Sequence, residues 1–522
     1  MNTSIPAAVA GAVSRRNLLK GGAALGATAM MGLPGSLLAQ PQKGGMLRVA
    51  LAQGGTSDTL DPATFSGSQQ IFLGWTLRNN LTEIGSDGAL KPELAESWSS
   101  DDATTWIFNL RKGVEFHNGK TLTAEDVIAS LNLHRGEDSK SGAKALLESV
   151  VSITAEGDTA VRVVLNGPNA DFPYILSDYH FNICPVNPDG TVDVSGTGTG
   201  GYILEEFNPG VRTRVRRNPN YWKEGAAHFE EGEILLINDP TAATNALVTG
   251  EVHAIESSEY KTLSLLGRRP DIAVESVPGG FHGSFAMNSA NAPFNNNDLR
   301  LALKYAIDRQ AIVDTVLKGH GVVANDHPVS PSMPYHDASI EQRPYDPDRA
   351  KFHLKKAGHD SLTLQLSASD GLYTGAVDAV TLYREHAAPT GLNIEVVREP
   401  GDGYWSDVWM KKPFFASSWG PRPVPDMILT TAYASTAAWN EGAFSNARFD
   451  ELLLAARGEL DEAKRGAMYG EMQRILSDEG GSVIPFFRSY VYGRSTAIAH
   501  SGQLGSDWPL DGHRAMERWW TA

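Results

Sequence analysis

Residues 81–130 read LTEIGSDGALKPELAESWSSDDATTWIFNLRKGVEFHNGKTLTAEDVIAS, and this run decides the fold expected for the whole chain. Thr105 to Leu110 alternates apolar and polar residues, as a half-buried strand requires. A turn follows, and residues 114–116 predict a second short strand. Thr123 and Asp126 then form the Thr-x-x-Asp pattern that begins a helix. The run therefore predicts two strands and a capped helix in close succession.

The same patterns continue on both sides of this run. Residues 46–52 predict the first strand, and residues 151–165 predict a strand pair around a turn. Residues 196–201, GTGTGG, formally satisfy G-x-G-x-x-G, but a dinucleotide loop must follow a strand and open a helix. Here strands are expected next, at 202–207 and 211–216, which favours a glycine hinge into a hairpin. Alternating strands and helices indicate an α/β fold.

The length and composition describe a large globular protein. With 522 residues, of which 41% are hydrophobic and 20% charged, two or three domains are expected. The net charge of −16 argues against nucleic acid or an anionic membrane as a partner, because phosphate binding needs a basic surface. Cys184 is the only cysteine, so no internal disulfide can form, and we expect it to be a buried apolar residue.

The first 39 residues are expected to be a signal peptide. Ser14 to Lys20 (SRRNLLK) resembles a twin-arginine export signal, and a weakly apolar stretch with five glycines and a proline follows from Gly21 to Leu38. A membrane anchor is disfavoured because it needs about twenty strongly apolar residues. The mature chain is expected to start near Gln40, in the periplasm, after export by the twin-arginine translocase.

Several segments together resemble the peptide/nickel family, family 5, of solute-binding proteins that serve ABC importers. The run quoted above carries most of the resemblance, which extends from about Gly44 to Gly493. Further matching segments are Leu60-Asp61-Pro62, Arg217 to Trp222 (RNPNYW), Phe294 to Arg309, Phe449 to Leu453 and Ile484 to Phe487.

The resemblance implies a two-lobed periplasmic binding protein fold of type II, in its large three-domain variety. A ligand would lie in the crevice between the lobes, which close around it by hinge motion. The expected domains are lobe I from residues 40–84, 200–278 and 485–522, accessory domain II from 85–199, and lobe II (domain III) from 279–484.

The most informative position for ligand chemistry is Arg422. Peptide-binding members of the family end a strand in Trp-x-x-Asp, and this Asp holds the α-amino group of the ligand. Counting from Trp419, the Asp position is occupied by Arg422. Pro421 and Pro423 stiffen its loop, and a planar guanidinium suits bidentate binding of a carboxylate. We therefore expect an anionic ligand group here, with Asp426 either binding an amine or neutralising Arg422; the alternative is an Arg422 that points to solvent or pairs with Asp426.

Other candidate residues follow from their positions in the family. Trp419 and Trp439 are expected as pocket walls, whereas the four-residue spacing of Trp405 and Trp409 favours core packing. The segment from Asp370 to Tyr373 corresponds to the place where dipeptide binders carry an arginine, and this chain has none there. The complete set of expected ligand-binding residues is Arg422, Trp419, Asp426, Trp439, Asn440, Tyr404, Asp370 and Tyr373.

Neither metal binding nor catalysis finds much support. His320, His327 and His336 share a loop-rich stretch, but their spacing is not that of helical ligands and no cysteine supports them, so no metal site is predicted. No cofactor is expected. Neither a G-x-S-x-G elbow nor an H-E-x-x-H motif is present, which disfavours an enzyme.

The predicted function is capture of a small, anionic, amino-acid-like solute for an ABC importer. An opine, an acidic or modified peptide and a metal–polycarboxylate chelate remain open. An ordinary di- or oligopeptide ligand is the first alternative, and a hydrolase exported by the twin-arginine route is an alternative of another class. The expected partners are the solute and the permease subunits, with the protein itself a monomer; service to a chemosensor also remains open.

Overall fold

The computed structural model describes residues 41–522. The predicted signal peptide lies outside the described residues. By their contacts, residues 40–522 form one compact unit. None of the helices in residues 41–522 has the length and apolar content that a membrane crossing requires.

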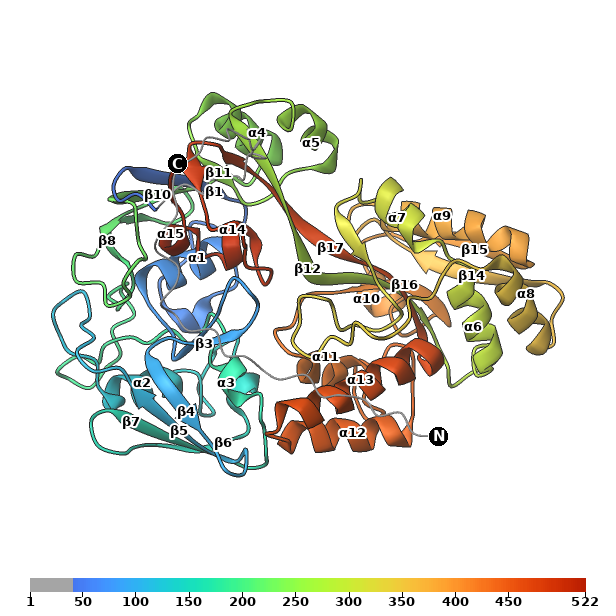
Figure 1. Ribbon diagram of the computed structural model, residues 1–522, viewed down its shortest axis with the longest axis horizontal. Helices are drawn as coiled ribbons and strands as arrows, with labels where there is room; N and C mark the ends of the chain where they lie inside the picture. The colour runs from blue at the N-terminus through green and yellow to red at the C-terminus, as the bar shows by residue number, and fades with distance from the viewer. Residues whose placement is uncertain (1–40) are drawn as a thin grey trace, which may run out of the picture. The chain divides into compact units, whose positions relative to one another are not determined.

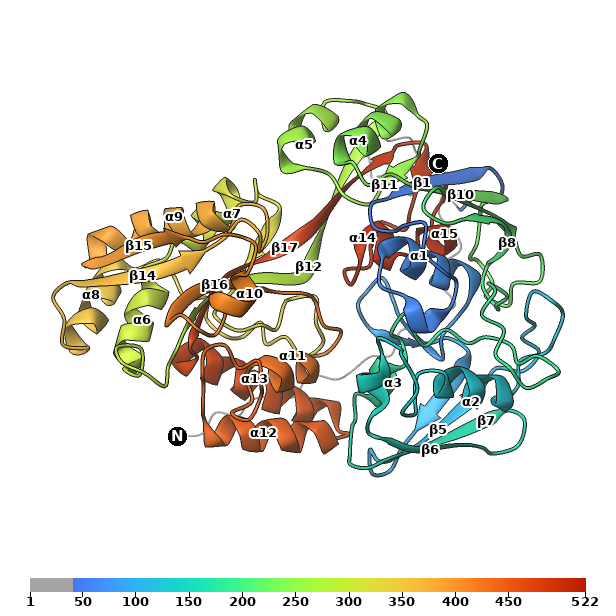
Figure 2. The same cartoon turned by 180° about the vertical axis from the view of Figure 1, so that it is seen from behind.

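An 11-stranded mixed sheet is the main structural element (Figures 1 and 2). Its order is β15-β14-β16-β12-β17-β11-β1-β10-β9-β8, with β13 paired to β17. The strands are β1 (Met46–Leu51), β8 (Tyr202–Asn208), β9 (Arg212–Arg217), β10 (Glu231–Leu236), β11 (Ala254–Ile255), β12 (Ile272–Met287), β13 (Gly321–Val323), β14 (Leu362–Ala368), β15 (Leu392–Arg398), β16 (Phe414–Trp419) and β17 (Ser482–Ser495).

The long strands β12 and β17 connect the two halves of this sheet. Their antiparallel register runs from Ile272 opposite Ser495 to Ala286 opposite Ser482. It shifts between Pro278 and His282, where Gly279 and Gly280 interrupt the ladder. Beyond the shift, β12 pairs with β16, so the strand that precedes Arg422 is held in the second half of the sheet.

Residues 81–130 contribute two strands of a separate four-stranded sheet and the helix beside it. The sheet order is β4-β5-β7-β6. The predicted strand Thr105–Leu110 is β5, and Asp126 accepts hydrogen bonds from the backbone and hydroxyl of Thr123 at 3.0 and 2.9 Å, which confirms the helix start. Residues 114–116 form only an isolated bridge. The elements are β4 (Ala95–Ser99), β5 (Thr105–Leu110), β6 (Val150–Ala155), β7 (Ala160–Leu165) and α2 (Ala124–Asn132), with the small hairpin β2 (Thr82–Ile84) and β3 (Leu90–Pro92) before them.

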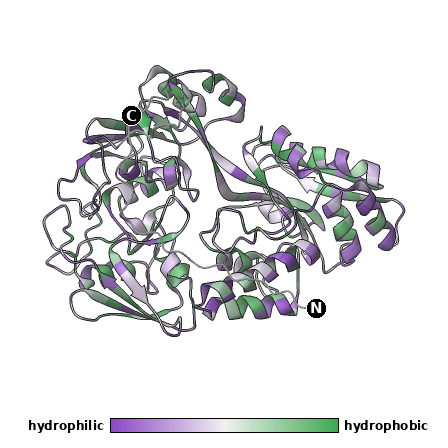
Figure 3. Cartoon of the chain, viewed as in Figure 1, coloured by the Kyte–Doolittle hydropathy of each residue, from purple (hydrophilic) through white to green (hydrophobic). Residues whose placement is uncertain are grey.

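Helices pack on the sheets, and hydrophilic and hydrophobic residues are mixed along them, as expected for helices with one buried face (Figure 3). They are α1 (Ser68–Leu77), α3 (Phe172–Ile175), α4 (Pro240–Thr249), α5 (Tyr260–Leu266), α6 (Asn297–Tyr305), α7 (Arg309–Thr315), α8 (Pro347–Lys356), α9 (Ala376–Ala387), α10 (Tyr404–Asp407), α11 (Pro425–Ala432), α12 (Ala447–Gly458), α13 (Glu462–Glu479), α14 (Pro509–Gly512) and α15 (Ala515–Arg518). The short strands β18 (Ile498–Ala499) and β19 (Trp520–Thr521) pair near the C-terminus.

The hydrophobic cores follow the two sheets. One core lies between Leu81 and Ile183, around the four-stranded sheet. Another joins segments from Leu47 to Trp519, and the largest lies between Phe285 and Phe486. These cores fall largely within the segments predicted as domains from the sequence; the three-domain division itself stays a prediction.

The glycine segment 196–201 is a close-packed passage and forms no phosphate loop. A Cβ at Gly198 would lie 2.1 Å from the carbonyl oxygen of Leu77, and one at Gly200 would lie 2.5 Å from the Leu77 carbonyl carbon. The strand that follows, β8, begins at Tyr202 as predicted. Glycine is needed here because the chain passes directly against the end of α1.

Candidate functional site

A cavity of about 500 Å³ brings Arg422 together with residues from distant parts of the chain. One wall comes from the end of β16 and the start of α11, together with Gly280 at the irregularity in β12. The opposite wall comes from α1, from the region around α3 and from the segment before α14. The lining residues on the Arg422 wall are Gly280, Ser332, Met333, Gly420, Pro421, Arg422, Pro423 and Met427, and the others are Trp75, Ile84, Gly88, Gly142, Ala143, Ala145, Leu146, Tyr174, Ile175, Ser177, Asp178, Tyr179, His180, Ser506, Asp507 and Trp508.

Arg422 projects from a tight loop between β16 and α11. Its Nη1 donates to the carbonyl of Pro421 at 2.9 Å and weakly to that of Gly420 at 3.5 Å. Within residues 41–522, no carboxylate forms an ion pair with Arg422. Burial lowers the pKa of its guanidinium, although Tyr179 from the opposite wall acts in the other direction. The cavity therefore contains a partly desolvated cation whose remaining donors are available to an anion.

Asp426 lies close in sequence to Arg422 but is engaged elsewhere. Its carboxylate accepts hydrogen bonds from Arg457 at 3.2 to 3.3 Å and from Thr430 at 3.3 Å. Asp426 is buried in the first turn of α11, and Arg457 reaches it from α12. The expected pairing with Arg422 is absent from the described structure, because a second arginine occupies this carboxylate.

The expected pocket tryptophans lie behind the Arg422 loop, outside the cavity lining. The Trp419 indole is buried and donates to Glu441 Oε1 at 3.1 Å. The Trp409 indole donates to the other oxygen of Glu441 at 2.8 Å. Trp439 is half exposed, with its ring 6.2 Å from that of Trp419. The prediction that Trp405 packs in the core is wrong: α10 is only four residues long, and 50% of Trp405 remains exposed.

The remaining expected residues are distributed over the segment 370–440 and mostly support the backbone. Asn440 bonds to the carbonyls of Ala434 and Phe444, and the Tyr404 hydroxyl donates to the carbonyls of Ser367 and Ala416, so both hold the backbone. Tyr373 is buried between Phe281 and Phe486, and its hydroxyl has no hydrogen-bond partner among residues 41–522. Asp370 is exposed near Arg398, at 3.8 Å. Of the eight expected residues, Arg422 alone lines the cavity described above.

The opposite wall contains residues that sequence reasoning missed. Tyr179 stacks on His180 and meets Trp75 and Trp508 edge-on, with ring centroids 6.5 and 5.8 Å away. The Trp75 indole N–H is buried without a partner in the described chain. These aromatic residues come from segments more than 400 positions apart, and no local pattern distinguishes them from core aromatics.

The three histidines of the loop-rich stretch do not come together. His327 and His336 lie near each other, with ring centroids 5.9 Å apart, beside a separate cavity of about 250 Å³. His320 instead stacks on Tyr260 and bonds to Ser276 at 3.0 Å. Two imidazoles alone do not make a metal centre of ordinary composition.

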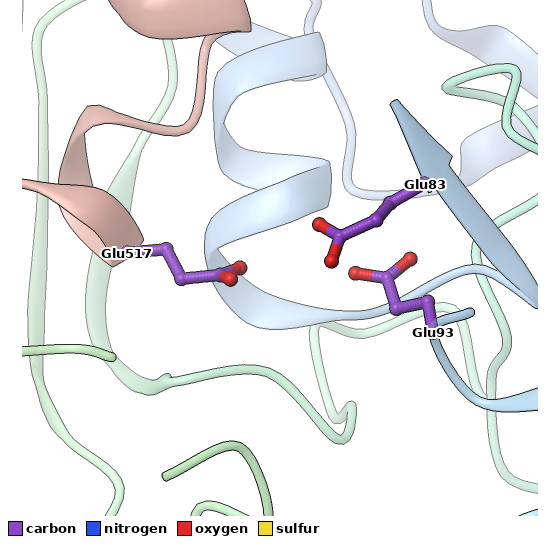
Figure 4. Close-up of side chains that lie close together, drawn as sticks. All are labelled: Glu83, Glu93 and Glu517. Atoms are coloured by element: carbon purple, nitrogen blue, oxygen red, sulfur yellow. The ribbon is translucent and has the colours of Figure 1, made fainter. Parts of the chain in front are cut away.

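Three buried or half-buried glutamates, Glu83, Glu93 and Glu517, do converge (Figure 4). Their charge is already matched by cations. Lys223 lies 2.8 Å from Glu83 and 2.7 Å from Glu517, and Arg514 lies 2.9 Å from Glu93. Although burial opposes it, Lys223 and Arg514 hold the pKa of Glu83 at about 2. The cluster is an internal ion network, and it stands next to the cavity because Arg514 lies over the ring of Trp75.

The arrangement of sheets and helices is similar to that of a solved structure. HbpA2 from Haemophilus parasuis matches with a TM-score of 0.80 and 20% identity, covering 90% of this chain and 99% of that chain. The protein therefore has the two-lobed α/β binding-protein fold that was predicted from the sequence.

The family follows from the sequence match. Residues 89–441 match the model of the bacterial extracellular solute-binding proteins, family 5 (middle region). This match spans more than half of the chain, which therefore belongs to this family. Glutathione-binding protein GsiB of Salmonella choleraesuis (strain SC-B67) is 26% identical over 499 residues, covering 92% of this chain and 95% of the relative. Di/tripeptide-binding protein 1 of Pseudomonas aeruginosa (strain UCBPP-PA14) is 25% identical over 502 residues, covering 86% and 90%.

Proposed function

We propose that the protein is the periplasmic solute-binding component of an ABC importer and that it captures a small, anionic, amino-acid-like solute. Membership of family 5 supports the transport class. The observation that carries the solute class is the position of Arg422, a cavity guanidinium that has no carboxylate partner in residues 41–522. An anion bound there would compensate a charge that the fold leaves partly desolvated.

The site would work by binding alone. The solute enters between the two walls, Arg422 donates to its carboxylate, and the closed complex is recognised by the permease. An opine, an acidic or modified peptide and a metal–polycarboxylate chelate all offer such a group. Export through the twin-arginine route, by the segment before residue 40, is part of the same proposal.

An ordinary di- or oligopeptide is the second candidate. It is favoured by the relatives named for di/tripeptide and glutathione binding. Against it stands the replacement of the family's ammonium-binding acid by Arg422. A neutral peptide would place its α-amino group against a guanidinium, which costs affinity unless the peptide binds in another orientation.

Isothermal calorimetry with matched anionic, neutral and cationic solutes tests this proposal. We expect the anions to bind best and Arg422→Ala to weaken the best anion by about 2–5 kcal/mol, the range for removing one partner of a buried charge pair. Arg214→Ala, on the exposed face of β9, is the control and should leave binding unchanged. Equal binding by Arg422→Ala and the unaltered protein would refute the assignment, and catalytic consumption of any solute would refute the binding class.

A further inference from the structure

The cavity wall opposite Arg422 carries acceptors and aromatic rings. Two carboxylates line it, those of Asp178 and Asp507, together with Trp75, Tyr179 and Trp508. Carboxylates and aromatic faces are the groups with which proteins bind organic cations. The cavity thus has a cationic wall and an anionic, aromatic wall facing each other.

The carboxylates of Asp178 and Asp507 differ in the interactions that they already form within the protein. Asp178 Oδ1 accepts from the backbone N–H of His180 at 3.0 Å and lies 2.7 Å from the Nδ1 of the same histidine. For Asp507, only the backbone carbonyl has a partner on another residue, the hydroxyl of Tyr490 at 2.9 Å. Within residues 41–522, the Asp507 carboxylate forms no ion pair. Within the described residues, Asp507 is therefore the cavity carboxyl group without a side-chain partner, whereas Asp178 is engaged by His180.

The Asp507 carboxyl group lies against Gly512. A Cβ at Gly512 would lie 2.6 Å from Asp507 Oδ1, so a larger residue there would push the carboxylate aside. Gly512 also has φ +68°, which favours glycine independently. Glycine at this position therefore leaves the carboxylate the place that it occupies in the cavity lining.

The electrostatic surroundings of Asp507 fit a missing cation. Burial raises the pKa of its carboxyl group, and Arg518, Arg514 and His513 offset this only in part from a distance. Arg518 itself pairs with Asp511 at 3.3 Å, and Arg514 is bound into the glutamate network. A cationic ligand group in the cavity would supply the positive charge near the Asp507 carboxylate that these arginines do not provide.

We propose that Asp507 binds the ammonium group of a zwitterionic solute whose carboxylate is held by Arg422 on the opposite wall. The inference rests on the proposed function and narrows it to dipolar, amino-acid-like molecules. It also reverses the polarity that the family resemblance implies, because the wall that would hold the ammonium of a peptide here holds the carboxylate. The cavity volume of about 500 Å³ suits a solute of this kind.

A matched set of probes and variants tests the inference. The probes are L-alanyl-L-glutamate, L-alanyl-L-aspartate and glutathione, each compared with its N-acetylated form, which keeps the carboxylates and loses the ammonium charge. In the unaltered protein we expect acetylation to weaken binding by about 30-fold or more. Asp507→Asn should weaken the free-amine probe by a similar factor and make acetylation nearly without effect. Asp348→Asn, at an exposed carboxylate of α8 outside the cavity lining, is the control, and it should keep the full difference between the two forms.

The outcomes separate this inference from the proposed function. If Arg422→Ala loses binding while Asp507→Asn retains the full preference for the free amine, the role of Asp507 is wrong and the anion site stands. If neither variant changes binding, both proposals fail. Failure of all three free-amine probes to bind at about 1 mM would also overturn the inference. Because each variant is judged by the ratio of two probes, partial unfolding of Asp507→Asn does not obscure the result.

Discussion

At the scale of single residues, His117 connects the opening run to the glycine segment. Its backbone N–H donates to the carbonyl of Gly198 at 2.8 Å, while Gly198 N–H donates to His117 Nδ1 at 3.3 Å. The other ring nitrogen, Nε2, donates to the carbonyl of Gly200 at 3.0 Å. This pattern requires the neutral imidazole, because Nδ1 serves as an acceptor.

The protonation of His117 gives a prediction about pH. Burial lowers its pKa from 6.5 to about 4, although the bond to Gly200 opposes the shift. The unfolded chain thus binds the His117 proton more tightly than the folded chain does. Neutral His117 therefore contributes up to about 3 kcal/mol to the free energy of unfolding, and this contribution is complete above pH 6.5 and lost as the pH falls toward 4. His117→Gln should flatten this part of the pH dependence of urea unfolding. The control, His359→Gln in the turn after α8, should not; equal slopes in both variants would contradict the assignment.

At the scale of elements, α3 and α13 are joined by a buried ion pair. Arg465 in α13 contacts Asp171, which immediately precedes α3, and its guanidinium lies 5.2 Å from the ring of Tyr335 and 5.7 Å from that of Tyr469. Burial raises the pKa of Asp171 to about 6 even though Arg465 opposes it. The cost of desolvation therefore exceeds the attraction for this carboxylate.

Substitutions of Arg465 and Asp171 test this balance between the cost of desolvation and the attraction of the two charges. Arg465→Met leaves Asp171 buried without its cation, so we expect the free energy of unfolding to fall by about 3–5 kcal/mol. The double variant Arg465→Met/Asp171→Asn removes both charges and should recover most of the loss. Arg448→Met breaks an exposed pair with Glu471 and should leave the free energy of unfolding almost unchanged, because solvent screens this pair. Denaturant unfolding of the four proteins checks this, and a double variant no more stable than Arg465→Met would contradict it.

Helices and strands could be predicted from the sequence more completely than the residues of the site. The strand Thr105–Leu110 and the helix start at Thr123 were predicted correctly because periodicity and capping are local. Arg422 could be singled out only through the family resemblance, because it stands three residues after Trp419, where peptide-binding members carry an Asp. The partner of Asp426 could not, because Arg457 comes from another helix, 31 residues away. The cavity wall with Tyr179 and Asp507 could not be predicted either, because only the fold brings its residues together.

At the scale of the whole molecule, the continuity of β12 and β17 couples the two halves of the large sheet. The strands pair from Ile272 to Ala286, across the irregularity after Pro278. The four-stranded sheet, in contrast, has its own core from Leu81 to Ile183. We expect the large sheet to open as one cooperative unit and the small sheet to be able to open by itself.

Two core substitutions distinguish these units. Phe285→Ala, in the second half of β12, removes a fully buried ring stacked on Tyr383 and should cost about 3–5 kcal/mol. Because β12 continues into the first half of the sheet, amide exchange should accelerate in β1 and β10 as much as in β14. Phe108→Ala, equally buried in β5, is the control, and its effect on hydrogen exchange should be confined to the four-stranded sheet. If Phe285→Ala accelerates exchange only in β14 to β16, the long strands act as a flexible connection and the halves unfold independently.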